Sequence, residues 1–262
     1  KEKSPYLLEC KLLVEAPLII EEGVEIYVQE GNSITVQDSM IINGTDDEPV
    51  KIIPSGDVSL DKIFIQNGYF EANHTTIQEM PINANNSVFK AKHLTTFSDF
   101  NSLKEVTSYI SLDGGYLEVK NSYLRSNTVT EGYRILNADG SIIENTKIYD
   151  APDAIEFINI KNGVLKNNYL YNSSDDGIDC NNCDSILIEG NFIFNTLDKG
   201  ISLGKEGVGA SSNAIIKRNV VANADIGIAI KDSSDAVIEN NTVYNCEDGI
   251  LVYQKTVGFF GG

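Results

Sequence analysis

Short alternations of apolar and polar residues recur along the C-terminal half of the chain at a nearly fixed interval. Each is a five-residue segment whose third and fifth residues are apolar, as in DAIEF, where Ile155 and Phe157 enclose Glu156. A period of two is typical of β-strands, because successive side chains of a strand point to opposite sides. The pattern predicts strands with one side toward a core at 153–157, 176–180, 199–203, 226–230 and 248–252.

An asparagine-rich segment precedes each of these strands and gives the length of the repeat. The five segments align without gaps, and their second asparagine position is occupied by Thr146, Asn168, Asn191, Asn219 and Asn241. The intervals are 22, 23, 28 and 22 residues, so one repeat contains an insertion, which we place at 204–213. Asparagine suits chain corners, because it tolerates the left-handed backbone conformation and its amides can stack in a ladder.

These repeats predict an all-β fold, a right-handed parallel β-helix with rungs of about 22–23 residues. No span of 12 residues between the predicted strands has helical spacing, so we expect no crossover helices. Rungs of parallel strands lie about 4.8 Å apart, and parallel crossovers are almost always right-handed. We expect a single β-helix domain over residues 1–262, with its regular rungs in 140–262.

The N-terminal part of the chain is less regular. Residues 1–60 are expected to form irregular rungs and a cap, because the exposed strand edges of a first rung would otherwise invite aggregation. The segments 68–77 and 115–124 resemble each other 47 residues apart, which is about two rungs. Residues 78–108 fit the repeat poorly, and this predicts a loop there.

The net charge of the chain disfavours some classes of binding partner. Lys and Arg total 20 against 38 Asp and Glu, which gives a net charge of −18. Nucleic acids and anionic lipid surfaces are disfavoured, since binding either requires clustered cations. No apolar stretch is long enough to span a membrane. The first residues contain neither an initiator Met nor a signal peptide, which predicts a processed chain or a piece of a longer protein with flanking domains.

Two of the four cysteines form a C-x-x-C pair, a spacing that also occurs in redox and zinc sites. Cys180 occupies an apolar strand position and no second such pair exists, so we interpret Cys180 and Cys183 as structural residues. The sequence leaves open whether Cys183 forms a disulfide with Cys246.

Stacking the rungs in register brings distant polar residues to one side of the β-helix. One predicted column, exposed to solvent, contains Glu156, Asp179, Ser202, Ala229 and Leu251. The neighbouring column contains Asn181, Gly204, Lys231 and Tyr253. At the strand entrances stack Asp153, Asp176 and Lys199, flanked by Asp175 and Asp198. Like charges one rung apart repel unless a cation or an opposite charge lies between them, so this face is a candidate cation site.

Four motifs of the C-terminal half resemble a known group of proteins. In order they are DDGIDC, DKGISLGKEG, GIAIKDSSD and GILVYQKTVGFFGG, and they are similar to β-helix domains found beside CotH-type kinase domains in large secreted bacterial proteins. More broadly, the chain resembles the pectin-lyase-like superfamily of carbohydrate-binding and sugar-cleaving β-helices. The resemblance implies the fold and a secreted or cell-surface location. It does not imply kinase activity, because the kinase motifs are absent, and a fold alone does not fix an activity.

Family-9 pectate lyases within this superfamily carry a D-D-G-x-D motif that holds calcium. Asp175, Asp176 and Asp179 match that motif, which implies a calcium site at these residues. The position of the catalytic lysine falls on Ser202, a departure that puts β-elimination in doubt. The lysines nearby, both displaced, are Lys199 and Lys205.

Polygalacturonases offer a second resemblance. Asp153 resembles the acid of their N-T-D motif, and Asp175 with Asp176 matches their D-D pair. Lys199 stands where these enzymes have the histidine of G-H-G, and Lys231 matches the lysine of R-I-K. The carboxyl groups that hydrolysis with inversion needs are thus present. The histidine is replaced, and Ala229 stands in place of the arginine.

We therefore expect an extracellular or cell-surface β-helix with an acidic, cation-binding face, with calcium as the candidate ion, that interacts with carbohydrate or serves as a rigid spacer. The alternative is an enzyme that cleaves or epimerises a uronic-acid polysaccharide. Its catalytic candidates are Asp153, Asp175, Asp176, Lys199 and Lys231. Its substrate-binding candidates are Glu156, Asn181, Ser202, Lys205 and Tyr253.

Overall fold

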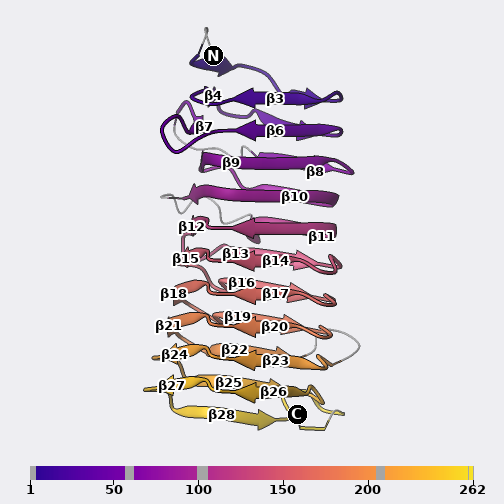
Figure 1. The fold of residues 1–262 in the computed structure, drawn as a ribbon, viewed down its shortest axis with the longest axis vertical. Coiled ribbons are helices and arrows are strands. Elements are labelled where there is room, and N and C mark those ends of the chain that lie inside the picture. The colour runs from indigo at the N-terminus through magenta and orange to yellow at the C-terminus, as the bar shows by residue number, and fades with distance from the viewer. Residues whose placement is uncertain (1–3, 57–61, 99–105, 205–209, 259, 262) are drawn as a thin grey trace.

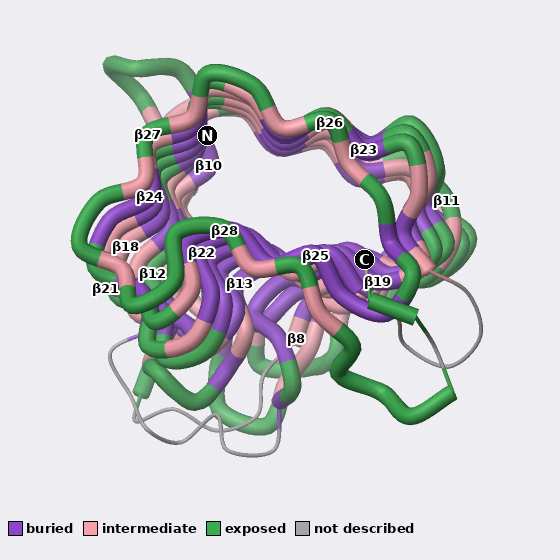
Figure 2. The backbone as a smooth tube through the Cα atoms, turned by 90° about the horizontal axis from the view of Figure 1, so that it is seen from below, coloured by how far each residue is buried: buried purple, intermediate pink, exposed green. Residues whose placement is uncertain are grey.

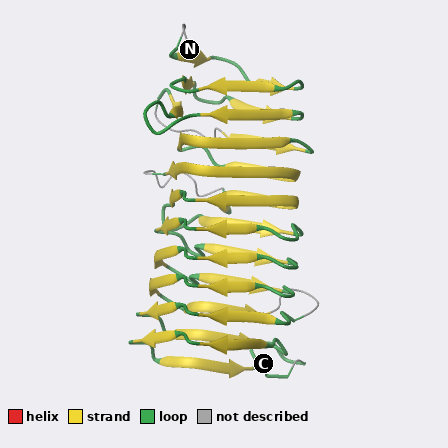
Figure 3. Cartoon of the chain, in the orientation of Figure 1, coloured by secondary structure: helices red, strands yellow, loops and turns green. Residues whose placement is uncertain are grey.

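The chain winds into a parallel β-solenoid of about 10 turns, whose rungs stack along one axis with the two termini at opposite ends (Figure 1). The structure, a computed structural model, describes residues 4–56, 62–98, 106–204, 210–258 and 260–261. Over these residues every regular element is a strand and none is a helix (Figure 3). The predicted all-β parallel β-helix is confirmed.

Seen along its axis, each rung has three sides (Figure 2). Face 1 contains β2 (Leu12–Val14), β5 (Ser33–Val36), β8 (Lys62–Gln66), β13 (Glu131–Leu136), β16 (Ile155–Ile158), β19 (Ile178–Asn181), β22 (Lys199–Gly204), β25 (Ile226–Lys231) and β28 (Asp248–Tyr253). Face 2 contains β3 (Leu18–Glu21), β6 (Ser39–Asn43), β14 (Ile142–Glu144), β17 (Val164–Lys166), β20 (Leu187–Glu189), β23 (Ala214–Lys217) and β26 (Ala236–Glu239). Face 3 contains β1 (Tyr6–Leu8), β4 (Glu25–Val28), β7 (Val50–Pro54), β12 (Tyr123–Arg125), β15 (Lys147–Tyr149), β18 (Tyr169–Ser173), β21 (Phe192–Thr196), β24 (Val220–Ala222) and β27 (Thr242–Tyr244).

Each strand pairs in parallel with the strand one rung away, and the register follows the sequence repeat. On face 1, Ile155 pairs with Ile178, Ile178 with Ile201, and Ile201 with Ile228. All four side chains are fully buried. Burying branched aliphatic side chains in such columns is the main stabilising contribution in this fold, at roughly 1.5–3 kcal/mol for each side chain.

Three long strands in the middle of the chain bend across the corners between faces. They are β9 (Tyr69–Gln78), β10 (Ile82–Phe97) and β11 (Ser108–Lys120). The loop expected within 78–108 does not lie in 82–97, because these residues form β10, which bends at Asn86 with a φ of 46°. Residues 99–105 of that segment lie outside the described residues. The two similar segments 68–77 and 115–124 do lie two rungs apart, since Tyr69 pairs with Val88 and Val88 with Tyr116.

Asparagines form ladders at the corners of the regular rungs. Between faces 2 and 3, the side chain of Asn168 donates to Asn191, Asn191 donates to Asn219, and Asn219 donates to Asn241, each at 3.0 Å. The second amide hydrogen of Asn191 reaches the backbone carbonyl of Leu165 at 2.9 Å. A buried amide with all its hydrogen bonds made carries no desolvation penalty, so this inner ladder fixes the corner.

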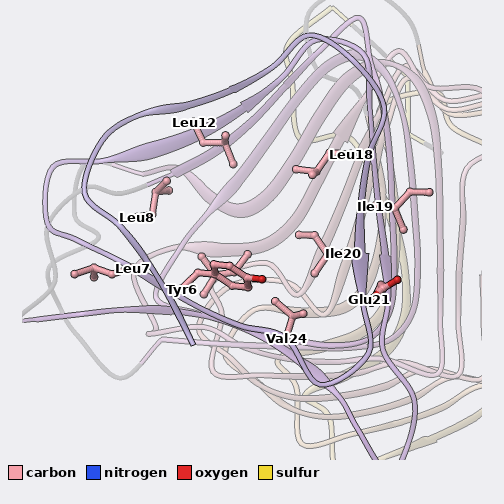
Figure 4. A pocket seen from close by; sticks show the side chains of 10 residues that line it. Tyr6, Leu7, Leu8, Leu12, Leu18, Ile19, Ile20, Glu21 and Val24 are labelled. Carbon is pink, nitrogen blue, oxygen red and sulfur yellow. The ribbon is translucent and has the colours of Figure 1, made fainter. Parts of the chain in front are cut away.

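Both ends of the solenoid leave apolar side chains uncovered. At the N-terminal end a cavity of about 570 Å³ opens between the first strands, lined among others by Tyr6, Leu12, Leu18 and Val24 (Figure 4). At the other end, Ile250 and Val252 of β28 each expose 53% of their surface, because no rung packs beneath them.

The four cysteines are free, so the disulfide between Cys183 and Cys246 that the sequence left open does not form. Cys180 and Cys183 belong to the buried core. No helix that could cross a membrane occurs over the described ranges.

Candidate functional site

A column of three ionisable side chains stands at the entrances of β16, β19 and β22 on face 1. Asp153 accepts a hydrogen bond from the backbone N–H of Asp176 at 2.9 Å. Asp176 in turn accepts one from the backbone N–H of Lys199 at 3.0 Å and one from its ammonium group at 3.1 Å. The structure thus brings together three residues that are 23 positions apart in sequence.

The close stacking at Asp176 and Lys199 depends on the glycines that follow them, whereas Ala154 follows Asp153. A Cβ atom at Gly177 would lie 2.7 Å from the backbone oxygen of Gly200, and a Cβ atom at Gly200 would lie 2.7 Å from that of Gly227. Such approaches leave no room for any side chain, so the D-G and K-G pairs of the sequence are packing requirements. The residue before each glycine is thereby fixed at the strand entrance.

Burial has shifted the ionisation of the two aspartates in this column. Asp153 exposes 9% of its surface and Asp176 exposes 4%. Burial raises the pKa of Asp153 to about 8, and the charges of Asp179, Asp176 and Asp175 add to this, against the hydrogen bond from Asp176. Asp153 is therefore mainly protonated at neutral pH.

The pKa of Asp176 is raised less, to about 6, first by burial and then by the charge of Asp179. The cations Lys199 and Lys231 oppose that shift. Burial alone would lower the pKa of Lys199, but its contacts with Asp198 and Asp176 outweigh burial and raise it. Lys199 is thus a fixed cation, although only 3% of its surface is exposed.

The second predicted column has the expected register, with Glu156 opposite Asp179, Asp179 opposite Ser202, and Ser202 opposite Ala229. The expectation that this column is exposed is wrong for Ser202 and Ala229, which are fully buried, and Glu156 exposes 8%. Asp179 is half-buried and accepts hydrogen bonds from Ser202 at 2.7 Å and from Asn181 at 2.7 Å.

The neighbouring column places a second buried cation beside these acids. The ammonium group of Lys231 lies 3.8 Å from a carboxylate oxygen of Asp179, and Lys231 exposes 5% of its surface. Tyr253 pairs with Lys231 one rung further on. Burial raises the pKa of the Tyr253 hydroxyl, so this group stays a hydrogen-bond donor over the physiological range.

Two groups of carboxylates in this region could hold a metal ion, and Asp153 belongs to both. The first group is Asp153, Glu156 and Asp179, and the second is Asp153, Asp175 and Asp176. Within each group, one oxygen from every residue lies within 4.8 Å of the others. The calcium set predicted from the sequence is divided between these groups: Asp179 belongs to the first and Asp175 with Asp176 to the second, and Asp153, which was not in the predicted set, belongs to both.

Sequence reasoning missed one partner of the site. Arg134 lies one rung above Glu156, and its Nε atom is 2.6 Å from a carboxylate oxygen of Glu156. The signal was present, because EGYRIL at 131–136 aligns with the later D-G-I-x strands and places Glu131 above Asp153. The candidate Lys205 lies outside the described residues, and Asp175 is exposed at the rim of the site.

The arrangement combines a protonated acid, ionised carboxylates and two buried ammonium groups. Carboxylates this close either share protons or bind a cation, because two unscreened negative charges at such distances repel strongly. A carboxyl group with a pKa near 8 can also donate a proton at neutral pH. The geometry therefore supports cation binding and proton transfer.

Several solved structures are similar to this chain at low sequence identity. The Dettilon tailspike protein matches with a TM-score of 0.50 and 12% identity over 92% of this chain and 55% of its own. A mutant of the periplasmic alginate epimerase AlgG matches with a TM-score of 0.47 and 13% identity, over 94% of this chain and 66% of its own. Endopolygalacturonase I from Stereum purpureum matches with a TM-score of 0.46 and 12% identity, over 93% and 95%.

The likeness to the tailspike protein, at 12% identity, shows a shared fold alone. This chain spans 55% of the length of the tailspike protein. No curated protein matches it. The family model described as right handed beta helix region matches residues 108–258, which is more than half of the chain. The chain therefore belongs to the right-handed β-helix family.

Proposed function

We propose that this protein is a secreted or cell-surface β-helix that binds carbohydrate through a divalent cation held on face 1, with calcium as the ion. The observation that carries the proposal is the two clusters of three acidic residues that share Asp153. Within each cluster, one oxygen from every residue lies within 4.8 Å of the others. As the motifs quoted above suggest, it belongs to a larger protein with flanking domains.

Calcium fits the chemistry of these residues. It takes six to eight oxygen ligands at about 2.3–2.6 Å in flexible geometry and prefers carboxylates. Asp153, Asp175 and Asp176 offer such oxygens, and the hydroxyl and amide groups of Ser202 and Asn181 lie next to Asp179. A bound cation would also replace the proton on Asp153, because positive charge favours the ionised carboxylate.

A cation would let a strongly acidic protein bind an acidic sugar. With a net charge of −18, the protein repels polyuronates at long range. A calcium ion shared between the carboxylates of the site and those of a uronic-acid polymer removes the repulsion locally. Neutral glycans need no such bridge, so calcium dependence separates the two ligand classes.

The experiment is calorimetric titration of calcium, followed by binding of a glycan panel with calcium and with chelator. We expect calcium to raise the melting temperature of the wild type and to be required for binding of acidic glycans. Asp176→Asn should lose both effects. Asp47→Asn, an exposed substitution far along the chain, should keep both. Calcium binding that is unchanged in Asp176→Asn would contradict the site, and failure of the whole panel would leave a rigid spacer.

A second function is favoured by one observation, the pKa of about 8 of Asp153 beside the exposed Asp175. A carboxylic acid paired with a carboxylate is the arrangement of acid–base glycan cleavage. If the protein is such an enzyme, purified protein releases oligosaccharides from a uronic-acid polymer. Asp153→Asn would then abolish release without changing the circular dichroism spectrum. No release from any polymer by the wild type would exclude turnover.

A further inference from the structure

The outer side of face 3 differs from the rest of the surface. Along β12, β15, β18 and β21, aromatic side chains face outward in two adjacent columns, with ring centroids 5.5–6.4 Å apart. They form what we term the aromatic stripe, which consists of Tyr123, Tyr149, Tyr169, Tyr171, Phe192 and Phe194. Phe192 exposes 46% of its surface and Tyr169 exposes 37%.

The stripe is free of acidic residues. Strands β12, β15, β18, β21, β24 and β27 contain no Asp or Glu, in a chain where 38 of 262 residues are acidic. Their charged residues are Arg125, which is 3.5 Å from Asp150, and Lys147. Lys147 is exposed and makes no ion pair with any described residue. In a protein of net charge −18, this is a local reversal of charge.

Lys147 also lines a hollow in the surface. The hollow has a volume of about 370 Å³ and is lined by His93, Thr95, Asn121, Ser122, Tyr123, Asn145 and Lys147. A second hollow of about 220 Å³ continues from it toward the N-terminal end and shares His93 and Thr95. Hydroxyl, amide, imidazole and ammonium groups thus line a groove that leads into the aromatic stripe. Its N-terminal end also contains one carboxylate, Asp46, which lies 2.8 Å from the imidazole of His74.

The groove and the stripe lie on one straight line along the solenoid. Thr95 pairs with Tyr123, Tyr123 with Lys147, Lys147 with Tyr169, and Tyr169 with Phe192. Consecutive residues of this line therefore stand one rung apart, about 4.8 Å. That interval is close to the length of one pyranose ring in an extended polysaccharide, so a linear glycan laid along the line meets one of these side chains at every sugar.

We propose that this line is a second binding site, for a linear anionic oligosaccharide. The aromatic rings present apolar surface to the C–H faces of the sugars, as aromatic side chains do for flat apolar ligands. The groove supplies hydrogen bonds to hydroxyl groups, and Lys147 pairs with a sugar carboxylate. The charge pattern favours this ligand over a second copy of the acidic chain, which would bring its own net negative charge to the interface.

The site is separate from the cation site in place and in chemistry. The acids around Asp153 lie on face 1, whereas the line runs along face 3. Binding here needs no metal ion, because the positive charge is supplied by Lys147. The two proposals can therefore fail independently.

The experiment is titration of fluorescently labelled hexagalacturonate into the full chain in the presence of chelator, which silences any calcium-dependent site. We expect binding that Lys147→Gln weakens about fivefold to tenfold, since a single charge contact of about 1 kcal/mol or slightly more corresponds to that ratio. Lys161→Gln, which removes an exposed lysine from another corner, should bind as the wild type does. Asp176→Asn should also leave this affinity unchanged.

A second variant and a neutral probe test the remaining parts. Phe192→Ala removes an exposed ring, and we expect a loss of about threefold to tenfold. Cellohexaose should bind at least about tenfold more weakly than the charged hexamer. The proposal is overturned if hexagalacturonate does not bind, if Lys147→Gln binds as tightly as the wild type, or if cellohexaose binds equally well. It is also overturned if sedimentation shows a dimer of the wild type that Phe192→Ala dissociates.

Discussion

Two columns of buried polar side chains run along this solenoid, and they behave in opposite ways. In the inner asparagine ladder, each amide both accepts and donates, so Asn168, Asn191 and Asn219 stack as identical neighbours with hydrogen bonds of 3.0 Å. In the column on face 1, Asp153 and Asp176 can only accept when ionised. Identical stacking is then unfavourable, and Asp153 retains a proton with a pKa of about 8.

The difference teaches how a repeat can hold both a structural and a reactive element. A side chain that is its own complement can be repeated in every rung at no electrostatic cost. A carboxylate repeated in the same way accumulates repulsion, which a proton, a lysine or a metal ion must relieve. The asparagine ladder stabilises the fold, whereas the column of Asp153 and Asp176 needs a proton or a cation to relieve its repulsion.

The largest effect is expected from placing a carboxylate in the neutral ladder. Asn191→Asp removes the donors to Leu165 and Asn219 and buries an acid beside two carbonyl oxygens. We expect a loss of roughly 3–5 kcal/mol in the free energy of unfolding, measured by chemical denaturation. Asn195→Asp makes the same change in the solvent-exposed ladder, and its loss should stay below about 1 kcal/mol. Equal losses at the two positions would contradict the comparison.

The reverse substitution in the acidic column should stabilise the protein. Asp153→Asn keeps an acceptor for the N–H of Asp176 and removes the buried acid. With a pKa raised from 3.8 to about 8, we expect a gain of roughly 3–4 kcal/mol at pH 7 without calcium. Asp175→Asn, at the exposed rim, should change stability far less. A loss of stability in Asp153→Asn would show that the charge is compensated in the folded state.

The pH profile of the same variant sharpens the result. Between about pH 4 and pH 8 the unfolded state has released the proton of Asp153 and the folded state has not. The folded state therefore binds more protons, and the free energy of unfolding of the wild type falls as the pH rises through this window. We expect the profile of Asp153→Asn to be flatter and to meet that of the wild type near pH 3. Denaturation at several pH values measures both curves.

A smaller effect is expected at the lysine of the column. Lys199→Gln removes the cation that contacts Asp176, and the pKa of Asp176 should rise further, so that this residue takes up a proton at neutral pH. Because Asp176 becomes protonated, we expect the free energy of unfolding to fall by only about 1–2 kcal/mol at pH 7. The loss should be greater at pH 8 than at pH 5.5, where Asp176 is already largely protonated. Lys11→Gln, an exposed control, should show no such dependence.

The sequence was sufficient to predict the fold and the register of the regular rungs. The spacing of Asn168, Asn191 and Asn219 gave the period, and the Asp-Gly-Ile segments gave the strands, because a period of two is visible in a single strand. It did not predict a strand at 82–97, because the asparagines of this segment indicate a turn, whereas the strand bends at Asn86 and continues. β10 is recognised through its pairing with β8, β9, β11 and β12.

The position of the acidic column was predicted, but the burial of its side chains was not. Register placed Asp153, Asp176 and Lys199 together, and the structure confirms that stacking. Their burial could not be read from alternation, because alternation gives the side of a strand and not what packs against that side. The partner Arg134 was missed for a related reason. Its rung departs from the asparagine pattern, so the regular spacing begins only after it.

The amide ladders also have a direction. Between the side chains of the inner ladder, each amide donates to the asparagine one rung nearer the C-terminus, whereas in the outer ladder Asn223 donates to Asn195 and Asn245 to Asn223, toward the N-terminus. A stack of such rungs is therefore directional, because the side-chain hydrogen bonds run toward the C-terminus at one corner and toward the N-terminus at another. The solenoid can be lengthened or shortened only by complete rungs if these hydrogen bonds are to be kept. Duplication of one complete repeat in the gene is therefore the change in length that this architecture tolerates best.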